Sequence, residues 1–236
     1  MTYAFTDIHG NYNLWKQIKN FLRPEDKVYF LGDACDRGKD GFKIMKELLF
    51  DSRVIYLKGN HEQLMIDAFV NLEEGDSEDF NWWVSVNGGS STAESLMALE
   101  TENRNYFLYL INQLPYYAFY ESEISGNKFF LSHSGYYNPN SDTKKEFFKH
   151  NCLWDRNHIK NEEDLDLNIY AVHGHTPVRS AFPLDAKLNK NKPVFYNKDS
   201  KIDLDLGTSN SNKIALLNLD TFEIHYFYDE RVFKNE

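Results

Sequence analysis

TDIHG at Thr6–Gly10 is the first of three short motifs that decide the expected fold. GDACDRG at Gly32–Gly38 and GNHE at Gly59–Glu62 follow it at nearly equal intervals. Each motif comes directly after a short apolar run and precedes a segment with helical periodicity, which predicts a repeated strand–loop–helix unit. In open α/β sheets, ligands bind at the carboxyl ends of the strands. The first quarter of the chain therefore predicts a ligand site built from strand ends.

Metal-ligating side chains stand at these predicted strand ends and after two later apolar runs. The candidate ligands are two carboxylates, one amide and three imidazoles: Asp7, His9, Asp33, Asn60, His133 and His175. This mix of oxygen and nitrogen donors suits manganese, iron, zinc or cobalt better than calcium, and it lacks the thiolates of a structural zinc site. Two ions that share Asp33 would use all of these ligands. For any one motif alone, an Asp or Asn that caps the following helix is the alternative.

Five motifs in a fixed order carry a family resemblance: D-x-H-G, G-D-x-x-D-R-G, G-N-H-E, H-x-G and G-H-T-P. They resemble the phosphoprotein phosphatase family of calcineurin-like metallophosphoesterases, in particular its small bacterial and phage branch of serine/threonine protein phosphatases. Four further segments also resemble that family, namely NGGSST (87–92), LPYY (114–117), LWDR (153–156) and IDLDLG (202–207). The likeness covers roughly residues 3–228. It implies an α/β fold of mixed α+β character with four αββα layers, in which helices flank two packed mixed β-sheets.

The resemblance also implies a dimetal centre. Asp7, His9 and Asp33 would hold the first ion, and Asp33 would bridge to the second. The remaining ligands of the second ion would be Asn60, His133 and His175. Such centres activate a bridging hydroxide and clamp the substrate. Manganese is the expected metal, with iron, zinc or cobalt as alternatives.

The resemblance assigns the catalytic side chains as well. His61 would protonate the leaving oxygen, with Asp36 orienting its ring, because a carboxylate fixes the tautomer and supports the imidazolium. Arg37 and Arg156 would bind the substrate phosphate with forked hydrogen bonds, and Asn60 would also contact it. The alternatives are that His61 only starts a helix and that Arg156 is a solvated surface residue.

Four further groups of residues lie beside these motifs or in the expected cap. Lys58 stands where the family often carries arginine, and it is expected at most to form a salt bridge. Glu62 is expected to be a buried acceptor behind the ligands rather than a ligand. Cys35 is expected to fill a tight loop, with redox sensitivity as the alternative. Trp82 and Trp83 are expected to pack within a cap.

The chain of 236 residues fits a single domain, predicted to span residues 1–236. Residues 73–113 are expected to form a helical cap, because Ser91-x-x-Glu94 resembles a capping box and a second helix is expected near 103–113. Earlier helices are expected at 11–22, at 40–50 and after GNHE. Strands are expected near 3–5, 28–31, 54–57, 116–121, 128–132, 169–173, 194–196, 202–206, 213–219 and 222–228. The strands after residue 115 look antiparallel.

Composition excludes several classes of protein. The net charge is −10 and no basic run is visible, which weighs against binding duplex nucleic acid. Two cysteines far apart do not form a disulfide framework. The sequence shows no secretory signal and no apolar stretch of about 20 residues, so a cytoplasmic protein without a membrane partner is expected. A monomer or weak oligomer is expected.

The leading functional hypothesis is a dimetal phosphomonoesterase that hydrolyses phosphoserine or phosphothreonine proteins, with phosphotyrosine and small phosphoesters still open. The alternative enzyme is a dinucleoside polyphosphate hydrolase acting on diadenosine tetraphosphate. Those relatives tend to lack the equivalents of Asp36 and Glu62. A nuclease or cyclic-nucleotide phosphodiesterase is less favoured, because Pro177 stands where those relatives often carry a second histidine. An inactive interaction scaffold ranks last, because no ligand type is missing.

Overall fold

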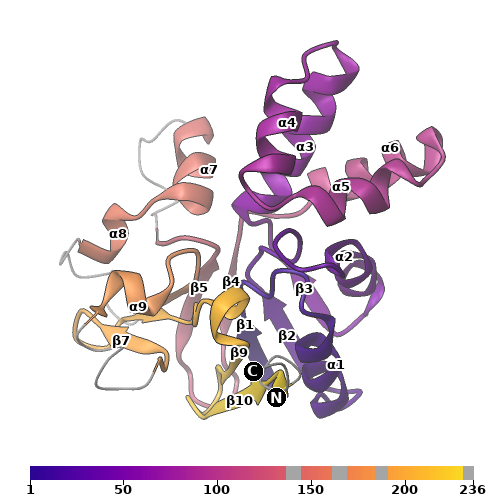
Figure 1. Cartoon of the computed structure of the whole chain (residues 1–236). Coiled ribbons are helices and arrows are strands. Elements are labelled where there is room, and N and C mark those ends of the chain that lie inside the picture. Colours follow the sequence, from indigo (N-terminus) through magenta and orange to yellow (C-terminus); the bar gives the residue numbers. More distant parts are fainter. Residues whose placement is uncertain (137–144, 161–168, 184–190, 231–236) are drawn as a thin grey trace.

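Two five-stranded sheets pack against each other at the centre of the molecule (Figure 1). The structure is a computed structural model that describes residues 1–136, 145–160, 169–183 and 191–230. In spatial order the first sheet contains β10 (Ile224–Tyr228), β9 (Lys213–Asn218), β1 (Thr2–Phe5), β2 (Lys27–Phe30) and β3 (Val54–Tyr56). The second sheet contains β4 (Tyr117–Glu121), β5 (Lys128–Ser132), β6 (Ile169–His173), β8 (Lys201–Asp203) and β7 (Val194–Tyr196).

Both sheets are mixed, as predicted. In the first sheet β1, β2 and β3 are parallel, whereas β9 and β10 are antiparallel. In the second sheet β5, β6 and β8 are parallel, and β4 and β7 are antiparallel edge strands. The antiparallel pattern expected after residue 115 is therefore wrong for the three central strands. Long connections join those strands in sequence, and such connections allow a parallel crossover.

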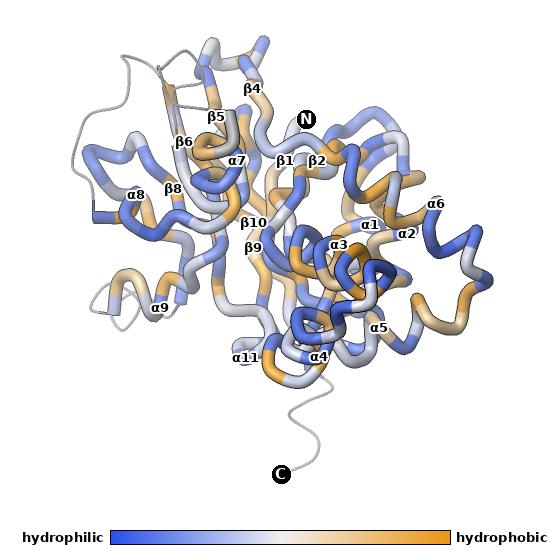
Figure 2. The backbone as a smooth tube through the Cα atoms, turned by 90° about the horizontal axis from the view of Figure 1, so that it is seen from above, coloured by the Kyte–Doolittle hydropathy of each residue, from blue (hydrophilic) through white to orange (hydrophobic). Residues whose placement is uncertain are grey.

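Helices cover the outer faces of the two sheets. On the side of the first sheet lie α1 (Tyr12–Phe21), α2 (Gly41–Phe50), α3 (Asn60–Glu73), α4 (Glu78–Ser85), α5 (Ser90–Met97) and α6 (Thr101–Asn112). The shorter helices are α7 (Lys145–Trp154), α8 (Asn157–Lys160), α9 (Val178–Ala181) and α11 (Thr208–Ser211). Seen from above, α7, α8 and α9 lie on the opposite side from α1 to α6, with the strands between them (Figure 2). The predicted αββα layering is confirmed. None of the described helices has the length and apolar character needed to cross a bilayer.

The alternation of side chains along β1 separates two apolar layers. Tyr3 and Phe5 face the helices and join the cluster that contains Trp15 of α1. Ala4 points the other way, into the layer between the sheets, where it meets residues such as Leu131 of the second sheet. Successive side chains of a strand point to opposite faces, so a strand with apolar residues at both parities is covered on both sides.

The segment 73–113 contains α4, α5 and α6, and Trp83 there belongs to the same apolar cluster as Phe5. Trp83 is buried as predicted, but Trp82 is 49% exposed, so its predicted packing role is wrong. The predicted capping box is also wrong. Helix α5 begins at Ser90 with Gly89, which has no side chain to donate or accept, at the N-cap, so Ser91 lies inside the helix. That residues 1–236 form one domain stays a prediction.

Candidate active site

The loops that follow β1, β2 and β6 hold the candidate ligands in an uncommon backbone conformation. Positive φ angles occur at Asp7 (52°), His9 (44°), Asp33 (64°), Asp36 (67°), Arg37 (64°) and His175 (70°). Non-glycine residues in the left-handed region are costly, by about 1–3 kcal/mol each, and such strain clusters at functional sites. The first two loops are joined by backbone bonds, including Asp7 N–H to the Gly32 carbonyl and His9 N–H to the Asp33 carbonyl, both 3.0 Å.

Glycines allow the first two motif loops to approach closely. Gly10 has φ +67°, and a Cβ there would lie 2.5 Å from the carbonyl carbon of Gly38. A side chain at either position would push the loops apart. The glycines that end the motifs TDIHG and GDACDRG therefore bring their ligand residues within reach of one another.

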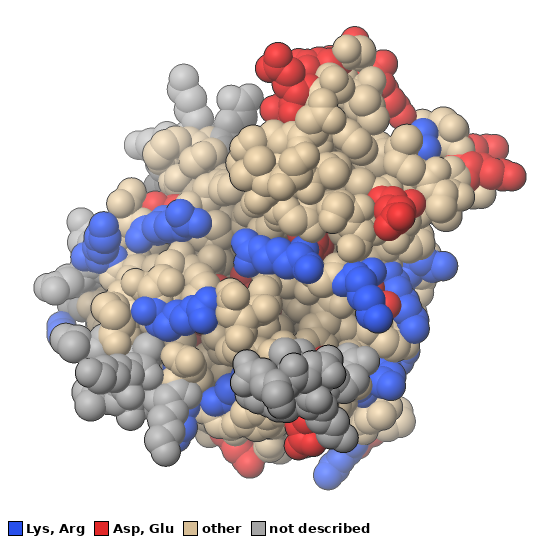
Figure 3. Space-filling view, in the orientation of Figure 1, with Lys and Arg blue, Asp and Glu red and all other residues tan. Residues whose placement is uncertain are grey.

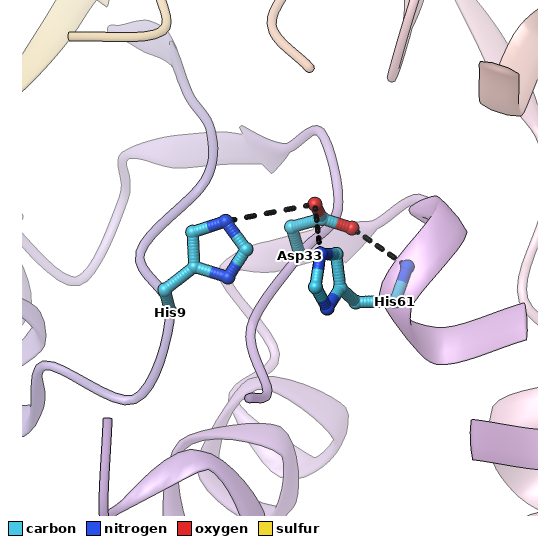
Figure 4. A group of neighbouring side chains, drawn as sticks. All are labelled: His9, Asp33 and His61. Carbon is cyan, nitrogen blue, oxygen red and sulfur yellow. Dashed lines mark hydrogen bonds and ion pairs between the residues drawn. The ribbon is translucent and has the colours of Figure 1, made fainter. Parts of the chain in front are cut away.

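Asp33 lies at the centre of the candidate ligands. Its Oδ2 is 3.7 Å from His9 Nε2, 3.8 Å from His61 Nε2 and 3.4 Å from His133 Nε2. Its Oδ1 accepts the His61 backbone N–H at 3.0 Å. Figure 4 shows the Asp33 carboxylate between the His9 and His61 rings. One carboxylate oxygen is thus shared by imidazoles that the sequence assigns to different ions.

Asn60, His133 and His175 converge beside Asp33. Asn60 Oδ1 lies 2.9 Å from His133 Nε2 and 2.9 Å from His175 Nδ1. Asn60 is the first residue of α3, whereas the two histidines follow strands of the second sheet. The structure therefore brings together the group that the sequence predicts for the second ion.

Carbonyl groups behind the histidines fix which ring nitrogen faces the site. His9 Nδ1 lies 3.1 Å from the Cys35 carbonyl, and His133 Nδ1 lies 2.8 Å from the Leu31 carbonyl. Because a carbonyl only accepts, each Nδ1 carries the proton and each Nε2 presents a lone pair, as in metal-binding histidines. Burial, followed by the charges of His61 and Arg37, holds the pKa of His9 well below its usual range.

Carboxylates crowd the opposite side of the site. Asp7 Oδ2 accepts from Thr6 Oγ1 at 2.5 Å and from the His175 backbone N–H at 3.1 Å, which orients the carboxylate. Burial and the charges of Asp7 and Glu62 raise the pKa of Asp33 well above its usual value. Asp205, at 2% exposure, has its pKa raised by burial and by Asp7. Asp205 lies in the IDLDLG motif (202–207), but the motif alone assigns it no role.

The donor set fits divalent cations. Two groups of potential ligands have all their donor atoms within 4.8 Å of one another: His9 with Asp33 and His61, and Asp7 with Asp33 and His133. Asp33 belongs to both groups. Buried carboxylates and neutral imidazoles that converge in this way are compensated by metal ions. His61 joins the first group by distance, although the sequence assigns it a different role.

Glu62 is a buried acceptor behind the ligands, as predicted. Its carboxylate accepts from the backbone N–H groups of Asp33 (2.9 Å), Ala34 (2.7 Å) and Gly59 (2.8 Å). It also accepts from the Tyr56 hydroxyl at 2.8 Å. Glu62 is fully buried. It therefore holds the loops that carry Asp33 and Asn60 in a fixed relation.

We expect Glu62→Ala to lower the free energy of unfolding by about 3 kcal/mol or more, because it leaves several buried donors without an acceptor. Urea denaturation of the purified protein measures this loss. Glu94→Ala, at an exposed position of α5, is the matched control and should change stability by less than about 0.5 kcal/mol. A loss at Glu62 no larger than at the control would show that Glu62 does not stabilise the loops.

His61 and Asp36 form a hydrogen-bonded pair. His61 Nδ1–H donates to Asp36 Oδ2 at 2.7 Å, which leaves Nε2 facing the Asp33 carboxylate. Burial raises the pKa of Asp36 to about 6, whereas hydrogen bonds from Trp83 and Thr92 act to lower it. Burial and the charge of Arg37 hold the pKa of His61 well below its usual value.

Arg37 reaches into the site from the second motif. Its Nη1 donates to His9 Nε2 at 2.9 Å, and its Nη2 donates to His61 Nε2 at 3.0 Å. Arg156 is exposed after α7, and its positive charge is one of the groups that lower the pKa of His175, after burial and His133. Arg37 therefore contacts the ligand group directly, whereas Arg156 acts on it through its charge.

The contacts of Lys58 and Cys35 indicate structural roles. Lys58 Nζ donates to Gln63 Oε1 (3.2 Å) and to the carbonyl and Oδ1 of Asn112 (both 3.1 Å). Among the described residues Lys58 bonds to amide groups and forms no salt bridge, so the expected salt bridge is not found there. The buried lysine instead links the segment after β3 to α6. Cys35 is fully buried, and burial with the charge of Asp36 raises its pKa well above the usual value. An undissociated buried thiol fits the predicted loop-filling role.

Charge is unevenly distributed on the face shown in Figure 3. Lys and Arg side chains lie across the middle of this face, and Asp and Glu side chains gather at the top, where Figure 1 places α3 and α4. The acidic tip contains the exposed residues Glu73, Glu74, Asp76, Glu78 and Asp79. Positive charge across the middle of a protein with net charge −10 is suited to an anionic substrate.

Comparison with known proteins agrees with this geometry. The profile of the calcineurin-like phosphoesterases matches residues 2–204. Serine/threonine-protein phosphatase 2 of Salmonella typhimurium is 30% identical over 172 residues, which cover 71% of this chain and 72% of that protein. Serine/threonine-protein phosphatase 1 of the same organism is 27% identical over 177 residues, which cover 73% and 77% of the two chains.

A solved protein serine/threonine phosphatase from Saccharomyces cerevisiae has the same fold, with a TM-score of 0.59 at 14% identity. The superposition covers 97% of this chain and 79% of that one. The family profile spans the loops that carry Asp7, Asp33, Asn60, His133 and His175. On the strength of that match, the chain belongs to the calcineurin-like phosphoesterase family.

Proposed function

We propose that this protein is a metal-dependent phosphatase that hydrolyses phosphoserine and phosphothreonine in proteins. The observation that carries the proposal is the convergence of the six candidate ligands, with Asp33 in their midst and the His61–Asp36 pair beside them. The similarity to two bacterial serine/threonine protein phosphatases supports the same substrate class. The cytoplasmic location and the monomer or weak oligomer expected from the sequence remain predictions.

Two divalent ions, with manganese as the proposed metal, would be held by Asp7, His9 and Asp33 and by Asp33, Asn60, His133 and His175. When bound, such ions polarise the phosphoryl group and lower the pKa of water. Their ligands would be ionised carboxylates and neutral imidazoles, which agrees with the lowered pKa values of His9 and His175.

The arginines would bind the phosphoryl oxygens. Arg37 now donates to the lone pairs of His9 and His61. If His9 Nε2 served as a metal ligand it could no longer accept from Arg37, and the guanidinium would turn its fork to the phosphate. Arg156 and Asn60 would contact the phosphoryl group from the side of His175.

His61 would supply the proton for the leaving group. A water molecule would form a new P–O bond to phosphorus as the P–O bond to the serine oxygen breaks, and the electron pair of the broken bond stays on the serine oxygen. His61, protonated at both ring nitrogens for this step and no longer accepting from Arg37, would donate its Nε2 proton to that oxygen, and the proton released by the attacking water would restore the imidazolium. Asp36 would hold Nδ1–H and stabilise the imidazolium before the transfer. The serine hydroxyl and inorganic phosphate are the products.

The test is a panel of phosphoserine, phosphothreonine and phosphotyrosine peptides and diadenosine tetraphosphate, each assayed with the metal-stripped protein and after addition of manganese. We expect the phosphoserine and phosphothreonine peptides to be hydrolysed fastest, activity to rise with manganese, and chelator to remove it. The first site has only Asp7, His9 and Asp33 as protein ligands, which predicts loose binding. Full activity in metal-stripped protein, or faster hydrolysis of diadenosine tetraphosphate, would contradict the proposal.

A further inference from the structure

The cap contacts the His61–Asp36 pair directly through Trp83 of α4. Trp83 Nε1–H donates to Asp36 Oδ2 at 2.7 Å, and His61 Nδ1–H donates to the same oxygen at 2.7 Å. Trp83 and Asp36 are 0% exposed, and His61 is 1% exposed. Two donors from separate segments of the chain therefore meet at one buried carboxylate oxygen.

A buried indole N–H needs an acceptor, and a backbone carbonyl would satisfy it. Here the acceptor is a carboxylate, which gives a shorter and stronger charge-assisted bond. Two such bonds restrict both the position and the rotation of the Asp36 carboxylate. Because His61 Nδ1 is bonded to that carboxylate, the direction of His61 Nε2 depends on where Trp83 holds Asp36.

The indole itself has little freedom to move. A Cβ on Gly89 would lie 2.4 Å from Trp83 Cε2, so the ring packs directly on the glycine backbone. The rings of Phe69 and Phe80 lie edge-on at centroid distances of 6.0 and 5.9 Å. A donor fixed in this way by packing can act as a rigid reference for the groups bonded to it.

The segment that follows α4 holds the main chain at the same place. Thr92 Oγ1 lies 3.1 Å from the backbone nitrogen of Asp36, whose N–H donates to it. The Arg37 N–H donates to the Gly88 carbonyl at 2.8 Å. Asp36 and Arg37 both have left-handed backbones, which persist only when their surroundings enforce them. Residues of the cap thus bond to the Asp36 carboxylate and to the backbone N–H groups of Asp36 and Arg37.

We propose that Trp83 is a positioning residue for the reaction. It holds Asp36 Oδ2 where His61 Nδ1–H meets it and so aims His61 Nε2 at the leaving oxygen of the substrate. This proposal rests on the acid role of His61 proposed above. Through Trp83 the cap would contribute to catalysis in addition to packing against the first sheet.

The decisive variant is Trp83→benzothienylalanine, which keeps the bicyclic shape and replaces the N–H with sulfur. We expect kcat for a phosphoserine peptide to fall about 10-fold, at the lower end of the loss typical for groups that orient a reacting residue. KM should not change, because Trp83 touches no substrate. For p-nitrophenyl phosphate, whose leaving group needs no proton, kcat should fall less than about 2-fold.

The same replacement at Trp82, which is 49% exposed on the same helix, is the matched control and should leave both substrates unaffected. Trp83→Phe, which every expression host can make, should show the same substrate dependence with a lower melting temperature. In an Asp36→Asn background the Trp83 replacement should cost less than about 2-fold, because groups in one network are not additive. A full 10-fold loss in that background would overturn the proposal.

Failure of the positioning role can be told from failure of the proposed function. If the unmodified protein hydrolyses no phosphoester in the presence of manganese, the proposed function is wrong and the acid role of His61 falls with it. The other case is an active unmodified protein whose Trp83 variant shows equal falls in kcat on both substrates, or no fall on either. The acid role of His61 can then stand, and the positioning role of Trp83 is overturned.

Discussion

Asp33→Asn should lower phosphatase activity by more than about 100-fold. Mutation of a residue that only supports a metal ligand typically lowers activity about 10–100-fold, and loss of a direct ligand should lower it further. Asp33 Oδ2 lies close to imidazoles assigned to both proposed ions, at 3.7 Å from His9 Nε2 and 3.4 Å from His133 Nε2. Metal content should fall at both sites together. Elemental analysis of the purified variant, alongside its turnover of a phosphoserine peptide, measures both effects.

The fold should survive this substitution. Asparagine keeps an Oδ1 that can accept the His61 N–H, which Asp33 now binds at 3.0 Å. The pKa of Asp33 is raised by burial and by neighbouring acids, so its ionised form destabilises the metal-free fold at neutral pH, and asparagine removes that charge. The metal-free variant should therefore melt at or above the temperature of the metal-free parent. A variant that kept two metals and near-normal turnover would show that Asp33 bridges nothing.

His61→Asn should reduce hydrolysis of a phosphoserine peptide by ~10²–10⁴-fold, the usual worth of general acid catalysis. The serine alkoxide is strongly basic and must be protonated as it leaves, whereas nitrophenolate leaves unassisted. The loss on p-nitrophenyl phosphate should therefore be distinctly smaller. Asp36→Asn should show the same pattern more weakly, because it misorients the imidazole that Asp36 Oδ2 holds at 2.7 Å.

Bound metal must be measured in the same His61 variant, since His61 Nε2 lies 3.8 Å from Asp33 Oδ2 and belongs to one of the potential ligand groups. Unchanged metal content with a substrate-dependent loss supports the acid role. Loss of one metal would make His61 a ligand instead. His225→Asn on β10, outside the site, is the control and should leave both activities unchanged.

The first three strands and their ligands could be predicted because each signal is local. Apolar runs mark β1, β2 and β3, and the ligand motifs begin within a few residues of each strand end. The parallel pairing of β5 with β6 and β8 has no such local signal, because it depends on how long connections cross the sheet. Fold class was therefore easier to predict than strand direction.

The residues that form the site could be predicted from the sequence, but the contacts that hold them in place could not. The bond between Trp83 and Asp36 joins positions 47 residues apart, and neither motif shows it. Burial of Asp205 near Asp7 likewise follows from the approach of two sheets. The left-handed backbone at His9 or Arg37 is disfavoured locally, and only the assembled loops hold it. These contacts join residues that are distant in sequence and meet only in the folded chain, so no local sequence pattern predicts them.

The division of the ligands between two sheets makes the site a reporter of how the halves of the chain assemble. Asp33 and Asn60 lie at the end of the first sheet, whereas His133 and His175 come from the second. The contact between Asn60 and His175 joins residues 115 positions apart, so it can form only after the apolar faces around Ala4 and Leu131 have met. Acquisition of activity during refolding would therefore mark the docking of the two sheets, a later event than formation of the helices and strands themselves.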